Sequence, residues 1–167
     1  MLKEEFRPIL LSRRGEALAW LSGLLMVVGW LILGIRELHV PSYVPYVTIF
    51  LLLASLSISL GNWMDRRTVI YLDPDGIQFD NGLRHVYLRW EQILQIILIT
   101  SNWGDKIRIY GAAGHFDFRS LGEVKMSGEV RGRMGFESGD LILQRILQMT
   151  GLQEIEHTGK QVYYARK

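Results

Sequence analysis

The sequence predicts a membrane protein of the α+β class. A two-helix transmembrane hairpin precedes an antiparallel β-barrel or sandwich, which is capped by a C-terminal α-helix. Two uncharged apolar segments, Ala17–Ile35 and Tyr43–Met64, predict the hairpin. Short runs of alternating polarity, separated by turn residues, follow from Thr68 and predict the strands. An amphipathic stretch between Ser138 and Gly151 predicts the helix.

The two apolar segments have the length of transmembrane helices. They contain 19 and 22 residues, and a helix needs roughly 20 to cross the hydrocarbon core. The seven residues between them, 36–42, allow only a tight antiparallel hairpin. A cleaved signal peptide is the alternative for the first segment. Its length, the lack of an Ala-x-Ala-like site before Arg36 and the second span that follows at once all favour an uncleaved anchor.

Basic residues beside the two segments predict their orientation. Six flank the outer ends of the hairpin and one, Arg36, lies in the connection. The six are Lys3, Arg7, Arg13, Arg14, Arg66 and Arg67. The positive-inside rule therefore places both termini in the cytoplasm. We expect a cytoplasmic N-terminal segment over residues 1–16, the hairpin over 17–64 and a cytoplasmic domain over 65–167.

Neither apolar segment contains Asp, Glu, Lys, Arg or His. Such residues usually mark ion or proton paths, so their absence argues against independent transport. Small residues recur instead, and they form a candidate helix-packing or partner face. The residues of this face are Gly23, Gly29, Gly34, Ser55, Ser59 and Gly61. The face serves either to pack the two helices on each other or to dock the hairpin against other membrane proteins.

Six strands are predicted in the domain, at the spacing of an antiparallel sandwich or barrel. They lie around Val69–Leu72, Ile77–Asp80, Val86–Trp90, Leu94–Thr100, Ile107–Ile109 and Phe116–Phe118. Asp73-Pro74-Asp75-Gly76 and Asn81-Gly82 are the turn signals between the first three.

The rest of the domain is predicted to contain a loop, a helix and a strand. The glycine-rich stretch Leu121–Gly135 indicates a long loop, with room for one strand near Val124–Met126. The helix that follows has Ser138 as a candidate N-cap and Gly151 as its C-cap. Gln161–Ala165 is a candidate last strand.

Two segments of the domain resemble those of bacterial pleckstrin-homology (PH-like) domains. They are the Leu-Asp-Pro-Asp-Gly-Ile stretch Leu72–Ile77 and the Leu-Arg-Trp-Glu-Gln-Ile stretch Leu88–Ile93. Many such domains follow a pair of transmembrane helices. The resemblance covers roughly Thr68–Gly151. It implies a seven-stranded barrel capped by a helix at the bacterial cytoplasmic membrane, with a scaffolding or binding role and no catalysis. The glycine-rich stretch and the tail after Gly151 depart from this pattern.

Eukaryotic PH domains are known for binding phosphoinositides, which needs clustered Lys and Arg on the first hairpin. Here that hairpin carries Asp73, Asp75 and Asp80 instead, which argues against a specific phosphoinositide pocket. One local group of basic residues forms a candidate interaction loop: Arg119, Lys125, Arg131 and Arg133. The alternative is that this loop is merely solvated.

The composition argues against several classes of chemistry. The chain has no cysteine, which excludes disulfides and thiolate catalysis. Its four histidines are scattered without metal-site spacing, and no nucleophile, base and orienting group come together. A net charge of +2 gives no case for nucleic-acid binding. We therefore expect no enzyme activity, no cofactor and no metal.

Two functions fit these observations. The first is a membrane-anchored PH-like scaffold or binding module at the cytoplasmic face, whose contacts are the lipid bilayer and other membrane proteins. The alternative is an accessory subunit of a larger integral membrane complex, such as an energy-transducing or transport assembly, that docks through its two helices.

Overall fold

The computed structural model describes residues 3–10, 12–126 and 129–166, and within them the side chains of 124–126, 129 and 131 are left out. The chain divides into two compact units, Ser12–Trp63 and the remainder on either side of it. Three α-helices and antiparallel sheets make up the described residues. The predicted α+β class, with two long apolar helices near the N-terminus, is therefore confirmed.

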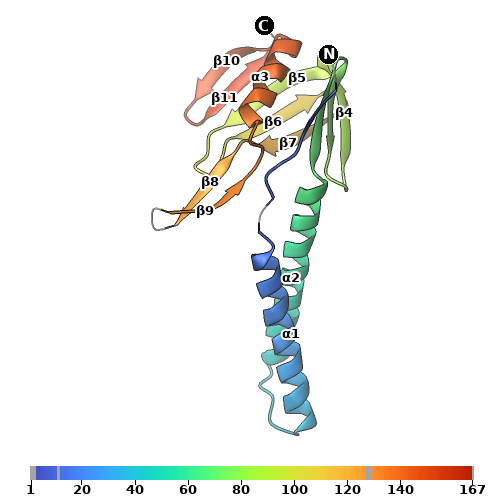
Figure 1. Ribbon diagram of the computed structural model, residues 1–167, viewed down its shortest axis with the longest axis vertical. Helices are drawn as coiled ribbons and strands as arrows, with labels where there is room; N and C mark the ends of the chain where they lie inside the picture. Colours follow the sequence, from blue (N-terminus) through green and yellow to red (C-terminus); the bar gives the residue numbers. More distant parts are fainter. Residues whose placement is uncertain (1–2, 11, 127–128, 167) are drawn as a thin grey trace. The chain divides into compact units, whose positions relative to one another are not determined.

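Helices α1 (Arg14–Ile35) and α2 (Val44–Arg67) form the helical unit, except for the last turn of α2. They run side by side (Figure 1), and each is long and apolar enough to cross a membrane. The residues buried between them are small: Gly23, Thr48 and Ser55. Large apolar side chains instead point outwards along both helices. The two helices therefore leave most of their apolar surface uncovered.

The first sheet has the strand order β1-β2-β3-β4. Its strands are β1 (Glu4–Phe6), β2 (Val69–Asp73), β3 (Gly76–Asp80) and β4 (His85–Arg89). Strand β1 lies in the segment 1–16 that the sequence analysis kept apart from the domain. It pairs with β2, with Phe6 opposite Ile70. Three residues, two of them glutamates, carry too little pattern to predict a strand.

The second sheet has the order β10-β11-β5-β6-β7. Its strands are β5 (Ile93–Ile99), β6 (Lys106–Gly111), β7 (Gly114–Arg119), β10 (Gln153–Thr158) and β11 (Gln161–Ala165). A 3-10 turn, η1 (Trp90–Gln92), precedes β5. Strand β11 was expected and β10 was not, because all six β10 residues are exposed and lack an apolar face. The last helix is thus followed by two strands.

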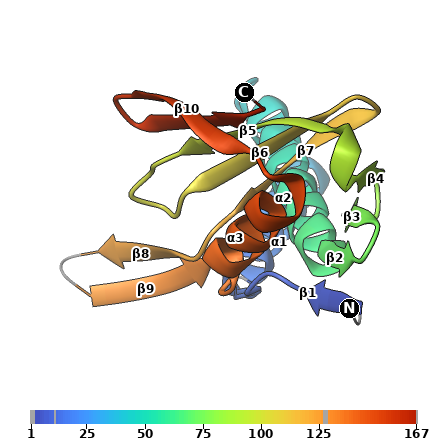
Figure 2. The same ribbon diagram turned by 90° about the horizontal axis from the view of Figure 1, so that it is seen from above.

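The glycine-rich stretch Leu121–Gly135 was predicted to be a long loop, and this prediction is wrong for most of its length. It forms the antiparallel pair β8 (Gly122–Met126) and β9 (Glu129–Met134), and β8 includes the candidate strand near Val124–Met126. Figure 2 shows this ribbon extending away from the two larger sheets. The glycine content was misleading because Gly122 and Gly135 serve close backbone packing rather than chain flexibility.

Helix α3 (Gly139–Thr150) buries its apolar face in the core that the two larger sheets share. The large apolar side chains that it buries in this core are Ile142, Leu143 and Ile146. Of the two predicted caps of this helix, the structure shows the C-cap as expected and the N-cap only in position. Gly151 has a φ of 66° and donates its N–H to the Leu147 carbonyl at 2.9 Å, as a glycine C-cap does. Ser138 occupies the N-cap position, but its side chain makes no capping hydrogen bond.

Four segments of the chain meet around Ser120, which is 8% exposed. Its N–H donates to the Asp105 carbonyl at 2.8 Å, and its Oγ accepts from the Asp105 N–H at 2.9 Å. A Cβ added to Gly104, Gly135 or Gly139 would lie within 2.6 Å of Ser120 atoms. The neighbouring Gly122 is equally confined, since its Cβ would lie 2.0 Å from the Trp103 carbonyl oxygen. Only glycines allow this junction to close.

A Gly122→Ala substitution should therefore destabilise the domain by about 1–3 kcal/mol or more, because the added methyl meets backbone that cannot swing away. Gly132→Ala is the matched control on the paired strand, since nothing lies within 4 Å of its added Cβ. Thermal unfolding of the detergent-solubilised full chain, followed by circular dichroism, measures both. Equal melting temperatures for the two variants would contradict the packing at this junction.

Candidate functional site

The candidate small-residue face is divided between two sides of the helical unit. A Cβ on Gly23 would lie 3.2 Å from Leu52 and 3.7 Å from the Ser55 hydroxyl, so Gly23 and Ser55 face each other across the helices. Gly29, Gly34 and Gly61 instead have open space around an added Cβ. The proposed face is therefore partly an internal helix contact and partly an outward surface.

Ser59 belongs to a polar network that joins the two helices. Its hydroxyl donates to Glu16 Oε1 at 2.8 Å and accepts from the Trp20 indole N–H, also at 2.8 Å. The Asn62 amide donates to Glu16 Oε2 at 2.9 Å. Glu16 immediately precedes the first apolar segment, so the pattern of small residues within the spans does not reveal it. Its carboxylate fixes the register of the two helices at this end of the hairpin.

The four candidate basic residues do not form a loop. Lys125 and Arg131 lie on strands β8 and β9, with side chains outside the described part. Arg133 pairs with Glu123, on the opposite strand, at 3.4 Å. Arg119 ends β7, where its Nη1 donates to the Trp103 carbonyl at 3.3 Å. Arg119 also lines a pocket, which gives it a different setting from the other three.

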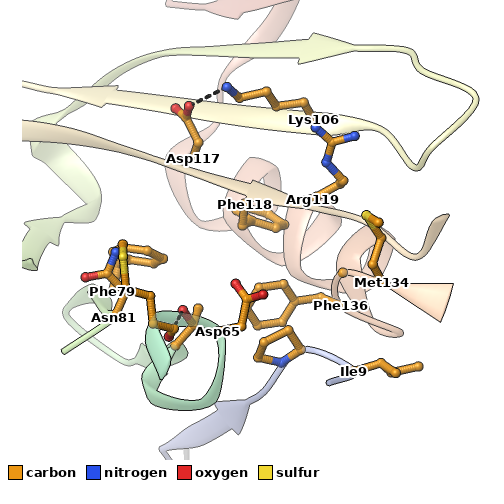
Figure 3. Close-up of a pocket in the computed structure, with 14 residues that line it drawn as sticks. Ile9, Asp65, Phe79, Asn81, Lys106, Asp117, Phe118, Arg119, Met134 and Phe136 are labelled. Atoms are coloured by element: carbon orange, nitrogen blue, oxygen red, sulfur yellow. Dashed lines mark hydrogen bonds and ion pairs between the residues drawn. The ribbon is translucent and has the colours of Figure 1, made fainter. Parts of the chain in front are cut away.

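That pocket has a volume of about 320 Å³, and all its lining residues belong to the β-sheet unit. Its apolar wall is made by Ile9, Phe79, Phe118, Met134 and Phe136. Its polar side chains are Asp65, Thr68, Asn81, Lys106, Asp117 and Arg119. Figure 3 shows Lys106, Asp117 and Arg119 on one side and Asp65 on the other, beside the ring of Phe136. Its size and mixed lining are those of a small-ligand site.

Asp117 is the centre of the ion pairs beside the pocket. Lys106 Nζ lies 2.8 Å from Asp117 Oδ2, and Arg108 Nε lies 3.1 Å from Asp117 Oδ1. Strands β6 and β7 bring them together, with Arg108 directly opposite Asp117. Partial burial raises the pKa of Asp117, but the hydrogen bonds and charges of Lys106 and Arg108 outweigh it and leave the pKa below its usual value.

The pocket was not predicted from the sequence. The alternation of Lys106 and Arg108 with apolar residues shows only that they face outwards from β6. That Lys106 lines one pocket with Asp65 and Phe136 depends on segments that are distant in the chain. Among the described residues, no group of three or more His, Asp or Glu side chains is arranged to hold a metal ion.

Comparisons of the chain with protein-family models, with curated proteins and with solved structures give no match. Its function is therefore inferred from its own residues and fold.

Removing the hydroxyl of Ser59 should weaken the helical hairpin. Ser59→Ala loses the bonds to Glu16 and Trp20, and interhelical hydrogen bonds in membranes contribute about 0.6 kcal/mol on average, with a maximum near 1.7. Ser57→Ala is the control, because the Ser57 hydroxyl bonds only to the Leu53 carbonyl of its own helix. The free energy of unfolding in mixed micelles, titrated with a denaturing detergent, should separate the two. An equal loss in both variants would refute the network's role.

The stability of the domain should fall in acid through Asp117. Its carboxylate is charged in folded and unfolded chains well above pH 3.8, its usual pKa, and the ion pairs then stabilise the fold. As the pH falls through the lowered folded-state pKa, the carboxylate is protonated and this contribution is lost. Asp117→Asn should cost about 1 kcal/mol at pH 7. It should also flatten the decline below pH 5.

Denaturant unfolding of the full chain at a series of pH values measures both effects. Asp80, whose pKa the Gly82 N–H and His85 lower, remains in the variant and should leave a residual slope. A variant whose pH profile runs parallel to that of the natural chain would show that Asp117 contributes nothing.

Proposed function

We propose that this protein is a non-enzymatic binding module, held at the cytoplasmic face of a bacterial membrane by its helical hairpin, with a PH-like β domain as the binding part. The two apolar helices supply the anchor. The domain supplies a pocket whose charged groups serve recognition. Together they make a module that acts by holding a ligand or partner at the membrane.

The pairing of β1 with β2 carries this proposal. Strand β1 precedes α1 in the chain and β2 follows α2, yet the two are neighbours in one sheet. If the helices cross the bilayer, both ends of the hairpin must then lie on the same side as the domain. The six basic residues that flank these ends favour the cytoplasm for that side.

Side-chain contacts support the place of the N-terminal segment in the domain. Lys3 Nζ lies 3.8 Å from Asp73 Oδ2 and 4.3 Å from the centre of the Tyr71 ring. Glu4 lies 3.9 Å from Arg145 on α3. Phe6 packs against the hydrophobic core. The segment before the hairpin is thus held by strand pairing, ion pairs and apolar burial.

The likeness to PH-like domains is supported by the strand pattern. Strands β2–β4 and β5–β7 form consecutive antiparallel triplets in two sheets, followed later by a helix that shares their core. Trp90, in the Leu88–Ile93 segment, is buried and donates its indole N–H to the Pro74 carbonyl at 2.9 Å. This bond joins the two segments on which the resemblance rests.

A second candidate function is that of an accessory subunit of a larger membrane complex. It is favoured by the open space around Gly29, Gly34 and Gly61, where another helix could approach closely. Under this proposal the hairpin is an interface as well as an anchor. Co-purification with a larger membrane protein in constant ratio from mild detergent would favour it, whereas a particle with the mass of this chain and its micelle would favour the free-standing module.

Cysteine labelling should place the hairpin's connection and its two ends on opposite sides of the membrane. The chain has no cysteine, so single substitutions report without background. In intact spheroplasts, a membrane-impermeant maleimide should label Ser42→Cys. It should label Ser12→Cys and Asn102→Cys only after permeabilisation.

Labelling of Asn102→Cys in intact spheroplasts would overturn the cytoplasmic orientation. If only one of Ser12→Cys and Asn102→Cys were labelled in intact spheroplasts, the segment before the hairpin and the domain after it would lie on different sides of the membrane. The β1–β2 pairing forbids this result. Recovery of all variants in the soluble fraction would overturn the membrane anchor itself.

A further inference from the structure

The pocket between Asp65 and Arg119 contains charged groups of both signs that its own residues do not fully use. Among the described residues, the Asp65 carboxylate has no hydrogen bond or ion pair. Within the described part of the chain, the Arg119 guanidinium donates from Nη1 to the Trp103 carbonyl at 3.3 Å, which leaves most of its N–H groups for a ligand. Lys106 pairs with Asp117 through an ammonium group that has three protons to donate.

The two sides of the pocket differ in charge. On the β6–β7 side, the lining residues Lys106 and Arg119 are cations and Asp117 is an anion, which forms ion pairs with Lys106 and with Arg108 beside the pocket. On the α2 side, Asp65 is the charged lining residue among those described. Figure 3 shows these two sides facing each other across the ring of Phe118. A ligand that carries a positive group at one end and a negative group at the other would complement both sides.

The apolar wall favours an ammonium as the positive group. Asp65 lies beside the ring of Phe136 (Figure 3), which contacts Phe118 edge to face with ring centres 5.7 Å apart. An ammonium bound to the carboxylate would also lie against aromatic faces, which attract cations. The guanidinium of Arg119 is suited to a phosphate, because its planar N–H groups can bind two oxygens at once.

The position of the pocket along the chain indicates where such a ligand comes from. Its lining includes Met64, the last residue of the apolar segment Tyr43–Met64, and Asp65 directly after it. A phosphate joined to an ammonium by a short linker is the headgroup of an aminophospholipid, and this headgroup lies at the level where an apolar span ends.

We propose that this pocket binds the headgroup of an aminophospholipid, with the ammonium on Asp65 and the phosphate on Arg119 and Lys106. The choice of a lipid as the source of this group rests on the proposed membrane anchoring. The chemistry that the site recognises, a phosphate linked to a primary ammonium, does not depend on that proposal. A quaternary ammonium such as that of phosphatidylcholine keeps the charge but has no N–H to donate to Asp65, so it should bind more weakly.

Native mass spectrometry of the full chain, released from neutral maltoside micelles, tests this directly. Short-chain phosphatidylethanolamine should give a one-to-one adduct, with at least about tenfold tighter binding than short-chain phosphatidylcholine or phosphatidylglycerol. Asp65→Asn and Arg119→Gln should each abolish this preference. Asp65→Glu, which retains the carboxylate, should restore part of it.

Asp75→Asn and Arg89→Gln are the matched controls, because both residues are exposed and neither lines this pocket. They should leave the preference unchanged. Equal adducts with all three lipids, or an undiminished preference in a correctly folded Asp65→Asn chain, would overturn the proposal. Folding is checked by near-UV circular dichroism.

Calorimetry with free phosphoethanolamine distinguishes the two sources of this chemistry. Weaker binding than that of the lipid is expected, since the free compound lacks the glycerol contacts. Tighter binding would overturn the membrane source. Because this assay needs no bilayer, its failure is separate from a failure of the cysteine labelling, which tests the anchor.

Discussion

The domain depends on the close approach of four chain segments at Ser120. The turn before β6, the end of β7, the start of β8 and the start of α3 all come within contact of this residue or of its neighbour Gly122. Paired hydrogen bonds with Asp105 and a backbone bond from Phe136 to Arg119 hold the junction. Since side chains would exclude this approach, the junction also fixes where α3 enters the core and where Phe136 lines the pocket.

Local patterns sufficed to predict much of this fold. The alternation in Ile107 and Ile109, and the turn at Asn81-Gly82, place strands within a residue or two of their observed limits, because one sheet face is buried. The two apolar helices follow from length and composition alone. These features each depend on a short stretch of chain, so a single sequence is enough to reveal them.

Other features depend on contacts between distant segments. Strand β1 is recognisable only through its pairing with β2, and β10 only through β11. Glycines in 121–135 read as a loop because a close-packing role and a flexible one use the same residue. The pocket joins Asp65, Arg119 and Phe136, none of which has a local signature. Four basic residues were predicted to form an interaction loop. Of these four, Arg119 is the one found among the described residues that line the pocket.

The strand pair β1–β2 also constrains the order in which the chain can mature. Glu4–Phe6 leaves the ribosome before the two helices, but its partner β2 emerges only after both helices have been synthesised. The first strand must therefore remain without its β2 partner until α1, α2 and β2 have all been synthesised. Closing this sheet ties the two ends of the hairpin together, so the domain can be completed only after both helices have been made.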